Sequence, residues 1–235
     1  MAFQVSPGIN VTEQDLTTVV PNVATTIGAM AGAFQWGPVL ERTQISTEND
    51  LVNTFGKPDD TTKCHFWTGA NFLAYANNLI VVRNVSANAR NSVVGDADAG
   101  TAILVKNEDH YDTLTYTDQL FVAKYPGALG NSLKVTAIDA NGWADATVNA
   151  DFIANFDRAP GTSTDVSNAG GSSDEMHVLV QDEDGLWTGT PGYVLEKHAF
   201  VSKASDAKKI DGSSNYVVNV LKNESRYAWV GLVTK

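Results

Sequence analysis

Cysteine is almost absent from this sequence: Cys64 is the single one among 235 residues. One thiol cannot close an intrachain disulfide, so a packed core has to stabilise the fold, and a reducing compartment suits it. Histidine is scarce as well, and His65, His110, His177 and His198 lack the short spacing that metal ligands need. We therefore interpret Cys64 as a small buried residue and expect no metal site at the histidines.

Positive charge is also in deficit. The chain has 16 Lys and Arg residues against 27 Asp and Glu, a formal net charge of -11, and its longest basic run is Lys208-Lys209. Neutralising phosphates requires clustered Lys and Arg, so no nucleic-acid partner is expected. The sequence has no apolar run that could span a bilayer and no signal-peptide pattern at its start, so we expect no membrane partner and synthesis in a cytoplasm.

The patterns that mark catalytic sites are missing. There is no Gly-x-Ser-x-Gly motif, and Lys57 is followed by Pro58, where a phosphate-binding loop has Ser or Thr. Two acidic runs, one at Glu108, Asp109 and Asp112 and one at 182–184, are interpreted as solvated surface, with a calcium site in the second as the alternative. We expect a protein that is not an enzyme and that binds no cofactor.

A patterned stretch runs from Thr25 to Val85. Small and apolar residues at 26–34 predict a buried strand, and loosely alternating residues at 39–46 predict a short edge strand. Leu79 to Val85 is short and β-branched, which is typical of the central strand of a sheet.

Two helices are expected between these strands. Ser46 or Thr47 can cap a helix that ends at Phe55, before the Gly56-Lys57-Pro58 break. A second helix is predicted from Lys63 to Asn77, and it is apolar on most sides, which indicates packing on both. Strand, helix, helix and strand together make one α/β layer that another part of the protein has to cover.

The first 24 residues show no helical period. Aliphatic residues are spread among polar residues and two prolines, which predicts an extended segment that cannot bury a face on itself. Three fates are open: the segment lies along its own domain, stays a frayed terminus, or adds a strand to a neighbouring molecule. In the last case the inter-subunit anchors are expected to be Val5, Ile9, Val11, Leu16, Val19 and Val20.

Beyond a glycine-punctuated linker at 86–100 the pattern changes to β. Strands are predicted at 101–105, 119–123, 133–138, 176–181 and 193–202, with further candidates at 145–156, a turn at Asn141-Gly142 and a loop at 157–175. These elements favour a β-sandwich or barrel. A helix or strand at 216–222 and a strand at 227–233 follow, and the last strand is expected to rejoin the first layer.

The chain is thus predicted to be α+β. An α/β layer of strand, helix, helix and strand carries an inserted β-sandwich or barrel-like domain and an extended N-terminal arm. The expected divisions are the arm at 1–24, an α/β core at 25–90 plus 206–235, and a β-rich domain at 91–205.

Motifs spread over the first ninety residues recur, in order and in spacing, in a known family. They are Ser6-Pro7-Gly8-Ile9, Thr17 to Val20, Gly32 to Pro38, Asn49 to Pro58, Asn71 to Tyr75 and Val81 to Arg83. Later pieces add to the match, at Tyr125 to Asn131, Ser205 to Lys209 and Ser214 to Tyr216. In these residues the chain resembles the amino-terminal part of the contractile tail sheath proteins of T4-like bacteriophages, the myovirus tail sheath family.

The resemblance implies a structural role. Subunits of this family stack as hexameric rings in a helical assembly around the tail tube, and contraction drives the tube through the host envelope for genome ejection. The resemblance also implies that the arm reaches an adjacent subunit by strand addition and that the β-rich domain protrudes. The family's tube-facing carboxy-terminal portion has no counterpart in this sequence, so we expect the chain to be an amino-terminal portion.

The partners that the resemblance implies are neighbouring sheath subunits, the tail tube protein, and the baseplate and tail terminator proteins. The expected location is the virion, after assembly in the host cytoplasm.

A different class of function remains as the alternative: a carbohydrate- or ligand-binding β module of a phage or bacterial surface assembly. Such a module needs an exposed tryptophan and acidic residues within 101–205, around a concave pocket with converging polar groups. The five tryptophans are instead expected to fill cores; they are Trp36, Trp67, Trp143, Trp187 and Trp229.

Overall fold

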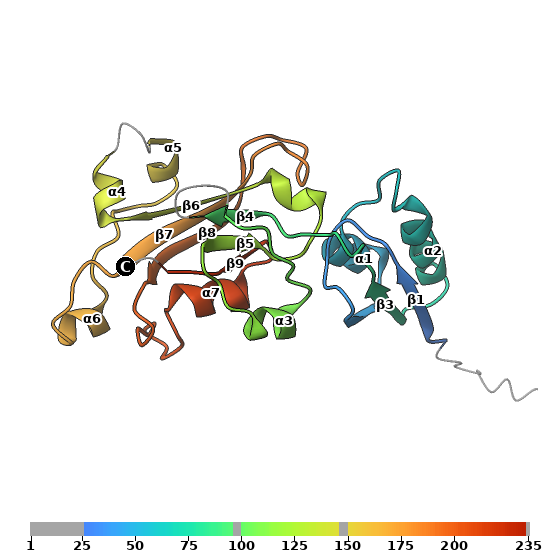
Figure 1. The fold of residues 1–235 in the computed structure, drawn as a ribbon, viewed down its shortest axis with the longest axis horizontal. Helices are drawn as coiled ribbons and strands as arrows, with labels where there is room; N and C mark the ends of the chain where they lie inside the picture. The colour runs from blue at the N-terminus through green and yellow to red at the C-terminus, as the bar shows by residue number, and fades with distance from the viewer. Residues whose placement is uncertain (1–25, 96–99, 146–149, 234–235) are drawn as a thin grey trace, which may run out of the picture.

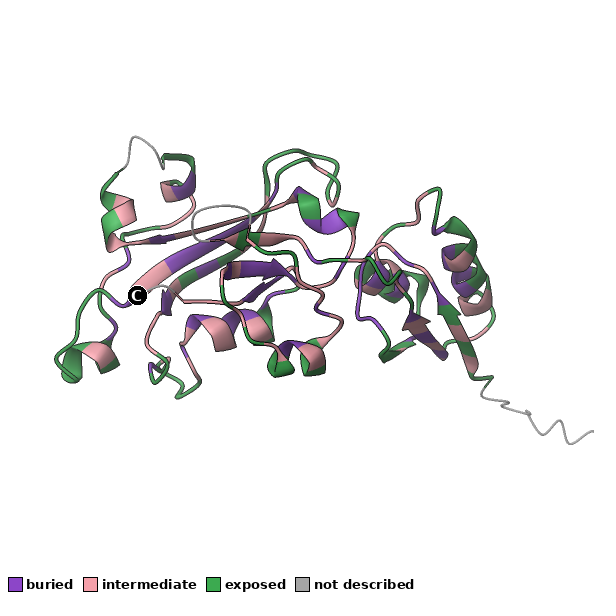
Figure 2. Cartoon of the chain, viewed as in Figure 1, coloured by how far each residue is buried: buried purple, intermediate pink, exposed green. Residues whose placement is uncertain are grey.

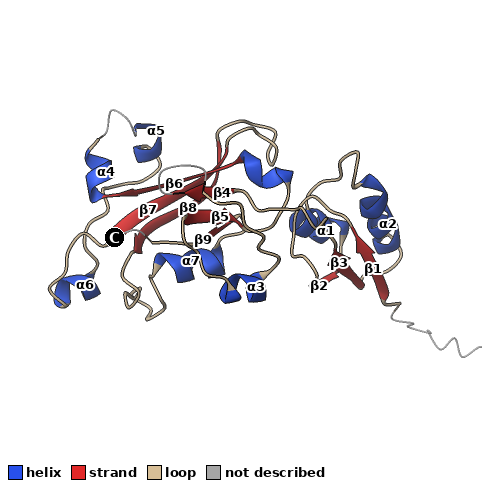
Figure 3. Cartoon of the chain, viewed as in Figure 1, coloured by secondary structure: helices blue, strands red, loops and turns tan. Residues whose placement is uncertain are grey.

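The computed structural model describes residues 26–95, 100–145 and 150–233. These residues form two lobes that lie side by side along the longest axis of the molecule (Figure 1). The smaller lobe contains β1 (Gly28–Gly32), β2 (Arg42–Ile45), α1 (Glu48–Phe55), α2 (Lys63–Leu73) and β3 (Leu79–Arg83). Helices and strands are mixed in both lobes, which confirms the α+β class (Figure 3).

The sheet of the smaller lobe has the order β1-β3-β2, with β1 parallel and β2 antiparallel to β3. Leu79, Val81 and Arg83 of β3 are buried, and the residues between them are half-buried. Such alternation places one face of a strand on a core, and it confirms β3 as the central strand. A strand within 26–34 is confirmed as β1, but its predicted burial is wrong, because β1 is an edge strand in which Ala29 and Ala31 are exposed.

Two reciprocal hydrogen bonds start α1. The Asp50 amide donates to Thr47 Oγ1, and the Thr47 amide donates to the Asp50 carboxylate, both at 3.1 Å. This capping box satisfies two backbone donors that the helix itself leaves free. Leu51 and Phe55 of α1 then join Phe66 of α2 in the apolar core above the sheet.

Helix α2 packs on one face only. Phe66 and Ala70 are buried, whereas Trp67 is 51% exposed and Tyr75, just after the helix, is 95% exposed. Cys64 is exposed as well, so its predicted burial is wrong. The helix lies on the outside of the lobe (Figure 2), and among the described residues its partners are the sheet and α1, while its outer side is exposed. The prediction of packing on most sides is therefore also wrong.

The larger lobe is built around two three-stranded antiparallel sheets, of order β4-β5-β9 and β6-β7-β8. Short helices connect the strands. Its elements are β4 (Val93–Gly95), α3 (Glu108–Thr113), β5 (Gln119–Ala123), the 3-10 helix η1 (Ala128–Ser132), β6 (Leu133–Asp139), α4 (Ala140–Ala144), α5 (Ala150–Ile153), α6 (Thr164–Asn168), β7 (Glu175–Asp182), β8 (Tyr193–Ser202), α7 (Val217–Glu224) and β9 (Ala228–Val230). The strands predicted at 119–123, 133–138, 176–181 and 193–202 are confirmed.

Several weaker predictions in this lobe are wrong. Residues 101–105 form no strand beyond one isolated bridge at Ile103. Asn141 and Gly142 belong to α4 rather than to a turn, because the Asp139 carboxylate accepts from both of their amides and caps the helix. The strand candidate at 145–156 contains α5, and the loop predicted at 157–175 contains α6.

The last strand does not return to the smaller lobe. β9 pairs with β5, so the prediction that it rejoins the first layer is wrong. Trp229 explains the placement: it is fully buried and stacks on Tyr111, with ring centroids 4.5 Å apart. A side chain of this size needs the core of the larger lobe. The segment predicted as helix or strand at 216–222 is the helix α7.

One apolar cluster joins both sheets of the larger lobe to α7. It contains Phe121 and Val230 from one sheet, Val178 and Val201 from the other, and Leu221 from the helix. The strand order of the two sheets does not by itself confirm the predicted sandwich or barrel, which stays a prediction. The predicted domain boundaries stay a prediction as well. Among the described residues no helix is long and apolar enough to cross a bilayer.

Candidate functional site at the neck between the lobes

The six residues predicted as inter-subunit anchors lie outside the described residues, so their contacts stay a prediction. They are Val5, Ile9, Val11, Leu16, Val19 and Val20. The structure instead draws attention to the neck, which we define as the segments 34–39 and 125–127 together with Arg83. In the neck, residues from both lobes meet.

Arg83 is the centre of the neck. Its side chain comes from the end of β3 and is 2% exposed. Nε donates to the carbonyl of Phe34 (2.9 Å) and Nη1 to that of Gly37 (2.8 Å). Nη2 donates to the carbonyls of Gln35 (3.0 Å) and Pro126 (2.6 Å). One guanidinium thereby fixes the chain that leaves β1 and a loop of the other lobe.

The charge of Arg83 is balanced by peptide dipoles. Burial lowers the pKa of Arg83 to about 10, while the nearby Tyr125 acts in the opposite direction. The side chain therefore stays protonated at neutral pH. A planar fork of donors suits four carbonyl oxygens at fixed positions better than the single ammonium of lysine does.

Backbone and ring contacts complete the neck. The Val39 amide donates to the Lys106 carbonyl at 2.8 Å, and the Asn107 side chain donates back to the Val39 carbonyl at 3.1 Å. The ring of Trp36 meets those of Tyr125 and Trp187 edge-on, with centroids 5.4 and 4.9 Å apart. Such edge-to-face pairs contribute about 0.5–1.5 kcal/mol each.

Gly127 permits the close approach of the two lobes. Its φ is +141°, a conformation that L side chains rarely adopt. A Cβ at this position would lie 2.8 Å from the Gln35 carbonyl oxygen and 3.3 Å from Arg83 Nη2. The neck therefore requires glycine here.

Beside the neck lies a cleft of about 390 Å³, which we call the interlobe cleft. Its walls carry the cationic residues Lys57, Lys124 and Arg226 and the aromatic residues Trp36 and Trp187. No Asp or Glu occurs among the described residues that line it. In a chain with an excess of acidic residues, this cleft has the opposite charge to the molecule as a whole.

Lys124 is held firmly in this wall. Its Nζ donates to the Ser225 carbonyl at 2.6 Å and lies 4.3 Å from the centroid of the Trp229 ring. Burial lowers the pKa of Lys124, and the charges of Glu108 and Glu196 partly oppose that effect.

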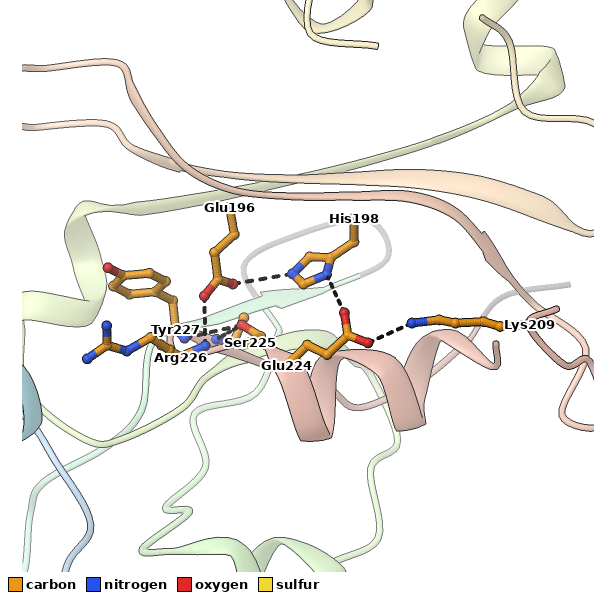
Figure 4. A network of polar contacts seen from close by, with 8 residues as sticks. Glu196, His198, Lys209, Glu224, Ser225, Arg226 and Tyr227 are labelled. Atoms are coloured by element: carbon orange, nitrogen blue, oxygen red, sulfur yellow. Dashed lines mark hydrogen bonds and ion pairs between the residues drawn. The ribbon is translucent and has the colours of Figure 1, made fainter. Parts of the chain in front are cut away.

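A polar network behind the cleft positions Arg226 (Figure 4). The Glu196 carboxylate accepts from the Arg226 amide at 2.8 Å and lies 3.3 Å from His198 Nε2. His198 Nδ1 is 3.9 Å from Glu224, which pairs with Lys209 at 2.6 Å. Burial alone would raise the pKa of Glu196, but the hydrogen bonds from His198 and from Arg226 outweigh it and lower the pKa.

Arg226 also bridges the lobes directly, since its Nη2 donates to the Asn53 carbonyl at 3.2 Å. Among the described residues, the neighbours of His198 in this network are the carboxylates of Glu196 and Glu224. Within the part of the chain that the structure describes, no group of three His, Cys, Asp or Glu residues could hold a metal ion.

Asp182 holds the loop that brings Trp187 to the cleft. Its carboxylate is fully buried and accepts from Ser132 Oγ (2.6 Å), the amides of Trp187 (3.0 Å) and Thr188 (2.8 Å), and Thr188 Oγ1 (2.9 Å). These bonds lower the pKa of Asp182 although burial acts to raise it. The prediction of a solvated acidic turn is therefore wrong for Asp182, while Glu183 and Asp184 are exposed.

The match to known proteins begins with the smaller lobe. Residues 25–83 match a family model described as the tail sheath protein Gp18 domain III N-terminal region. The matched segment ends at Arg83 and so covers all five elements of the smaller lobe.

Three curated relatives are tail sheath proteins. The one from Salmonella phage ViI is 33% identical over 195 residues, 82% of this chain and 28% of the relative. The one from Enterobacteria phage T4 is 36% identical over 140 residues, 58% of this chain and 20% of the relative. The one from Vibrio phage KVP40 is 46% identical over 78 residues, 33% of this chain and 12% of the relative.

The chain thus spans less than a third of the length of these relatives. The resemblance predicted from motifs in the sequence is confirmed by alignments that cover most of the chain. Over most of its length the chain is thus similar to tail sheath proteins of bacteriophages, and residues 25–83, which form its smaller lobe, match the N-terminal region of tail sheath domain III.

Proposed function

We propose that the chain is a structural subunit of a contractile phage tail sheath. In this proposal, subunits polymerise as stacked hexameric rings around the tail tube, and contraction drives the tube through the host envelope for genome ejection. The observation that carries it is the relationship to the tail sheath protein of Salmonella phage ViI over 82% of this chain.

The neck supports a mechanical role. A subunit that transmits force has to keep the relative orientation of its parts under load. Arg83 ties the lobes with buried hydrogen bonds, and the Trp36 ring lies against two rings of the larger lobe. These hydrogen bonds and ring contacts hold the two lobes in a fixed relative orientation, which would let the subunit move as a rigid body.

The partners in this proposal are neighbouring sheath subunits, the tail tube protein, and the baseplate and tail terminator proteins. We propose no enzymatic reaction. The arm at residues 1–24 is proposed to link neighbours by strand addition, with the six aliphatic anchors named above in the pockets of the acceptor sheet. An edge strand such as β1, which has one free side within the described sheet, is the kind of element that accepts an added strand.

The alternative, a carbohydrate-binding module, receives no support from a specific contact. It needs an exposed tryptophan in the β-rich part. Within the described residues of 101–205, Trp187 packs against Trp36 and Tyr227, and Trp143 packs against His177. Trp67 is 51% exposed, but it belongs to the smaller lobe and not to the β-rich part.

Electron microscopy of the purified chain at high concentration tests the proposal. Rings or striated tubes are the expected result, and a chain that stays monomeric contradicts it. A second sample, with residues 2–20 deleted, tests the arm: we expect folded lobes by circular dichroism but no polymer. Polymers that form as readily without residues 2–20 would refute strand addition by the arm.

A further inference from the structure

The interlobe cleft is unfilled on its cationic side. Lys57 forms no ion pair with any described residue. One nitrogen of the Arg226 guanidinium donates to the Asn53 carbonyl. Cations that converge in a concave site lined by aromatic rings favour an anionic occupant. The charge of the lining therefore indicates carboxylates rather than a neutral or basic ligand.

Two further groups point to an occupant. The Trp187 indole Nε1 is buried and has no hydrogen-bond partner within the described residues. A buried donor without an acceptor costs about 1–3 kcal/mol. An acceptor from another molecule reaches this nitrogen only after the side chains that cover it move, because the atom is shielded from solvent. The neighbouring Leu186 is 58% exposed at the cleft wall. The cleft thus presents donors, cations and an apolar side chain together.

A surface of complementary character exists on the same chain. We call it the acidic face and define it by Leu40, Glu41, Glu108 and Asp109. Leu40 is 60% exposed, and its φ of +57° is a strained conformation for a branched residue. Glu41, Glu108 and Asp109 are exposed around it.

Electrostatic repulsion on the acidic face is relieved only in part. Lys222 pairs with Glu108 at 3.4 Å, on the side of α3 that faces α7. The pKa of Glu41 is raised by burial and by the charges of Asp109 and Glu108. Cations from another molecule would favour the charged form of Glu41.

We propose that the acidic face of one copy of this chain docks into the interlobe cleft of the next copy. Carboxylates of the acidic face meet Lys57 and Arg226, and Leu40 packs beside Leu186. This inference rests on the proposed function, because it names the contact through which subunits associate.

The geometry of such a contact has a direct consequence. The two surfaces are different patches of one chain, so the interface is heterologous: every copy offers one cleft and one acidic face. Heterologous contacts close into rings when the rotation allows it and otherwise continue as helical filaments. A single type of contact therefore suffices to start the kind of polymer that the proposed function requires.

The test uses the full chain and two charge-reversal variants. The cleft variant is Lys57→Glu with Arg226→Glu, and the face variant is Glu41→Lys with Asp109→Lys. Sedimentation velocity at low ionic strength is expected to show self-association at least about tenfold weaker for each variant alone, because like charges now oppose each other. An equimolar mixture is expected to recover association, since each variant then supplies the surface that the other can bind.

A control matched to the cleft variant carries the same change in net charge elsewhere. Lys197→Glu with Lys208→Glu changes two exposed lysines outside the cleft, and it is expected to associate like the unchanged chain. Thermal unfolding of every variant checks the fold, and Lys57→Glu alone keeps the Arg226 to Asn53 contact in case the double variant loses the neck. Association of the unchanged chain should also weaken in 1 M NaCl, where screening acts within about 3 Å.

The outcomes separate the two proposals. If the chain associates but the cleft and face variants behave like the control, the contact proposed here is wrong and the sheath function stands. If reversal weakens association but the mixture does not recover it, the pairing of these two surfaces is wrong. If the unchanged chain does not associate at all, the proposed function fails, and this inference fails with it.

Discussion

Replacing Arg83 by methionine tests the neck most directly. The change keeps the length and apolar stem of the side chain but removes every donor. The carbonyls of Phe34, Gly37 and Pro126, whose bonds to Arg83 are buried, then lose their partner, and so does the part-buried carbonyl of Gln35. Leaving a buried acceptor without its donor costs about 1–3 kcal/mol, so we expect the loss of these bonds together to cost about 3–5 kcal/mol.

The expected result is a large fall in thermal stability. For a chain of this size each kcal/mol lowers the melting temperature by about 2–4 °C, so Arg83→Met should lower it by roughly 10 °C. Arg83→Lys keeps the charge but cannot reach four oxygens at once, and we expect an intermediate loss. Differential scanning calorimetry measures both changes.

Arg42→Met is the matched control, because Arg42 is exposed on the edge strand β2. Surface substitutions usually change stability by less than about 0.5 kcal/mol. The reasoning fails if Arg83→Met melts within 2–3 °C of the unchanged chain, roughly the effect of about 1 kcal/mol, or if Arg42→Met is equally destabilising.

Three more perturbations probe other parts of the fold. Gly127→Ala places a Cβ 2.8 Å from the Gln35 carbonyl at a φ of +141°, and we expect a loss of about 2 kcal/mol in urea unfolding, whereas an unchanged midpoint would contradict the close approach. Asp182→Ala leaves the donors at Ser132 and in the 187–188 segment without an acceptor, and we expect the free energy of unfolding to fall by about 3 kcal/mol. We also expect the tryptophan fluorescence to become accessible to a quencher, and an unaltered emission spectrum would argue against the role of Asp182. Burial lowers the pKa of His177 below its unfolded value near 6.5. The neutral ring therefore contributes stability at higher pH, and this stability is lost as the pH falls through the folded pKa. Urea midpoints that do not decline from pH 7 to pH 5, or that decline equally in His177→Phe, would exclude this contribution of His177.

Strong local patterns could be predicted from the sequence. The short, β-branched run that begins at Leu79 identified the central strand, and the capping residue at Ser46 or Thr47 marked the start of α1, because both signals act over a few residues. The strands at 119–123 and 176–181 were equally predictable from β-branched content between turn residues.

The wrong predictions concern elements whose burial or pairing depends on residues far away in the sequence. Apolar content around α2 does not reveal that Trp67 and Tyr75 lie on a face without a partner. The pairing of β9 depends on a pocket for Trp229 that residues far away in the sequence form. The Asn141-Gly142 pair is a good turn signal, but the carboxylate of Asp139 stabilises a helix instead.

The candidate site was the part least visible in the sequence. An arginine at the end of an apolar strand, as in Leu79–Arg83, is an unusual signal that could have drawn attention to the neck. Its acceptors are backbone carbonyls, which every residue has, so no pattern of side chains identifies them. The cleft combines positions from 36 to 226 and is formed only when the lobes meet.

The choice of acceptors around Arg83 has a consequence for how the sequence can change over generations. Since peptide oxygens accept from the guanidinium, the hydrogen bonds of Arg83 do not depend on which side chains stand at positions 35 and 126. Insertions or deletions between β1 and Val39 are not tolerated in the same way, because they would move the oxygens themselves. We expect variants of this chain to differ freely in the identity of these residues while keeping the length of the loop constant.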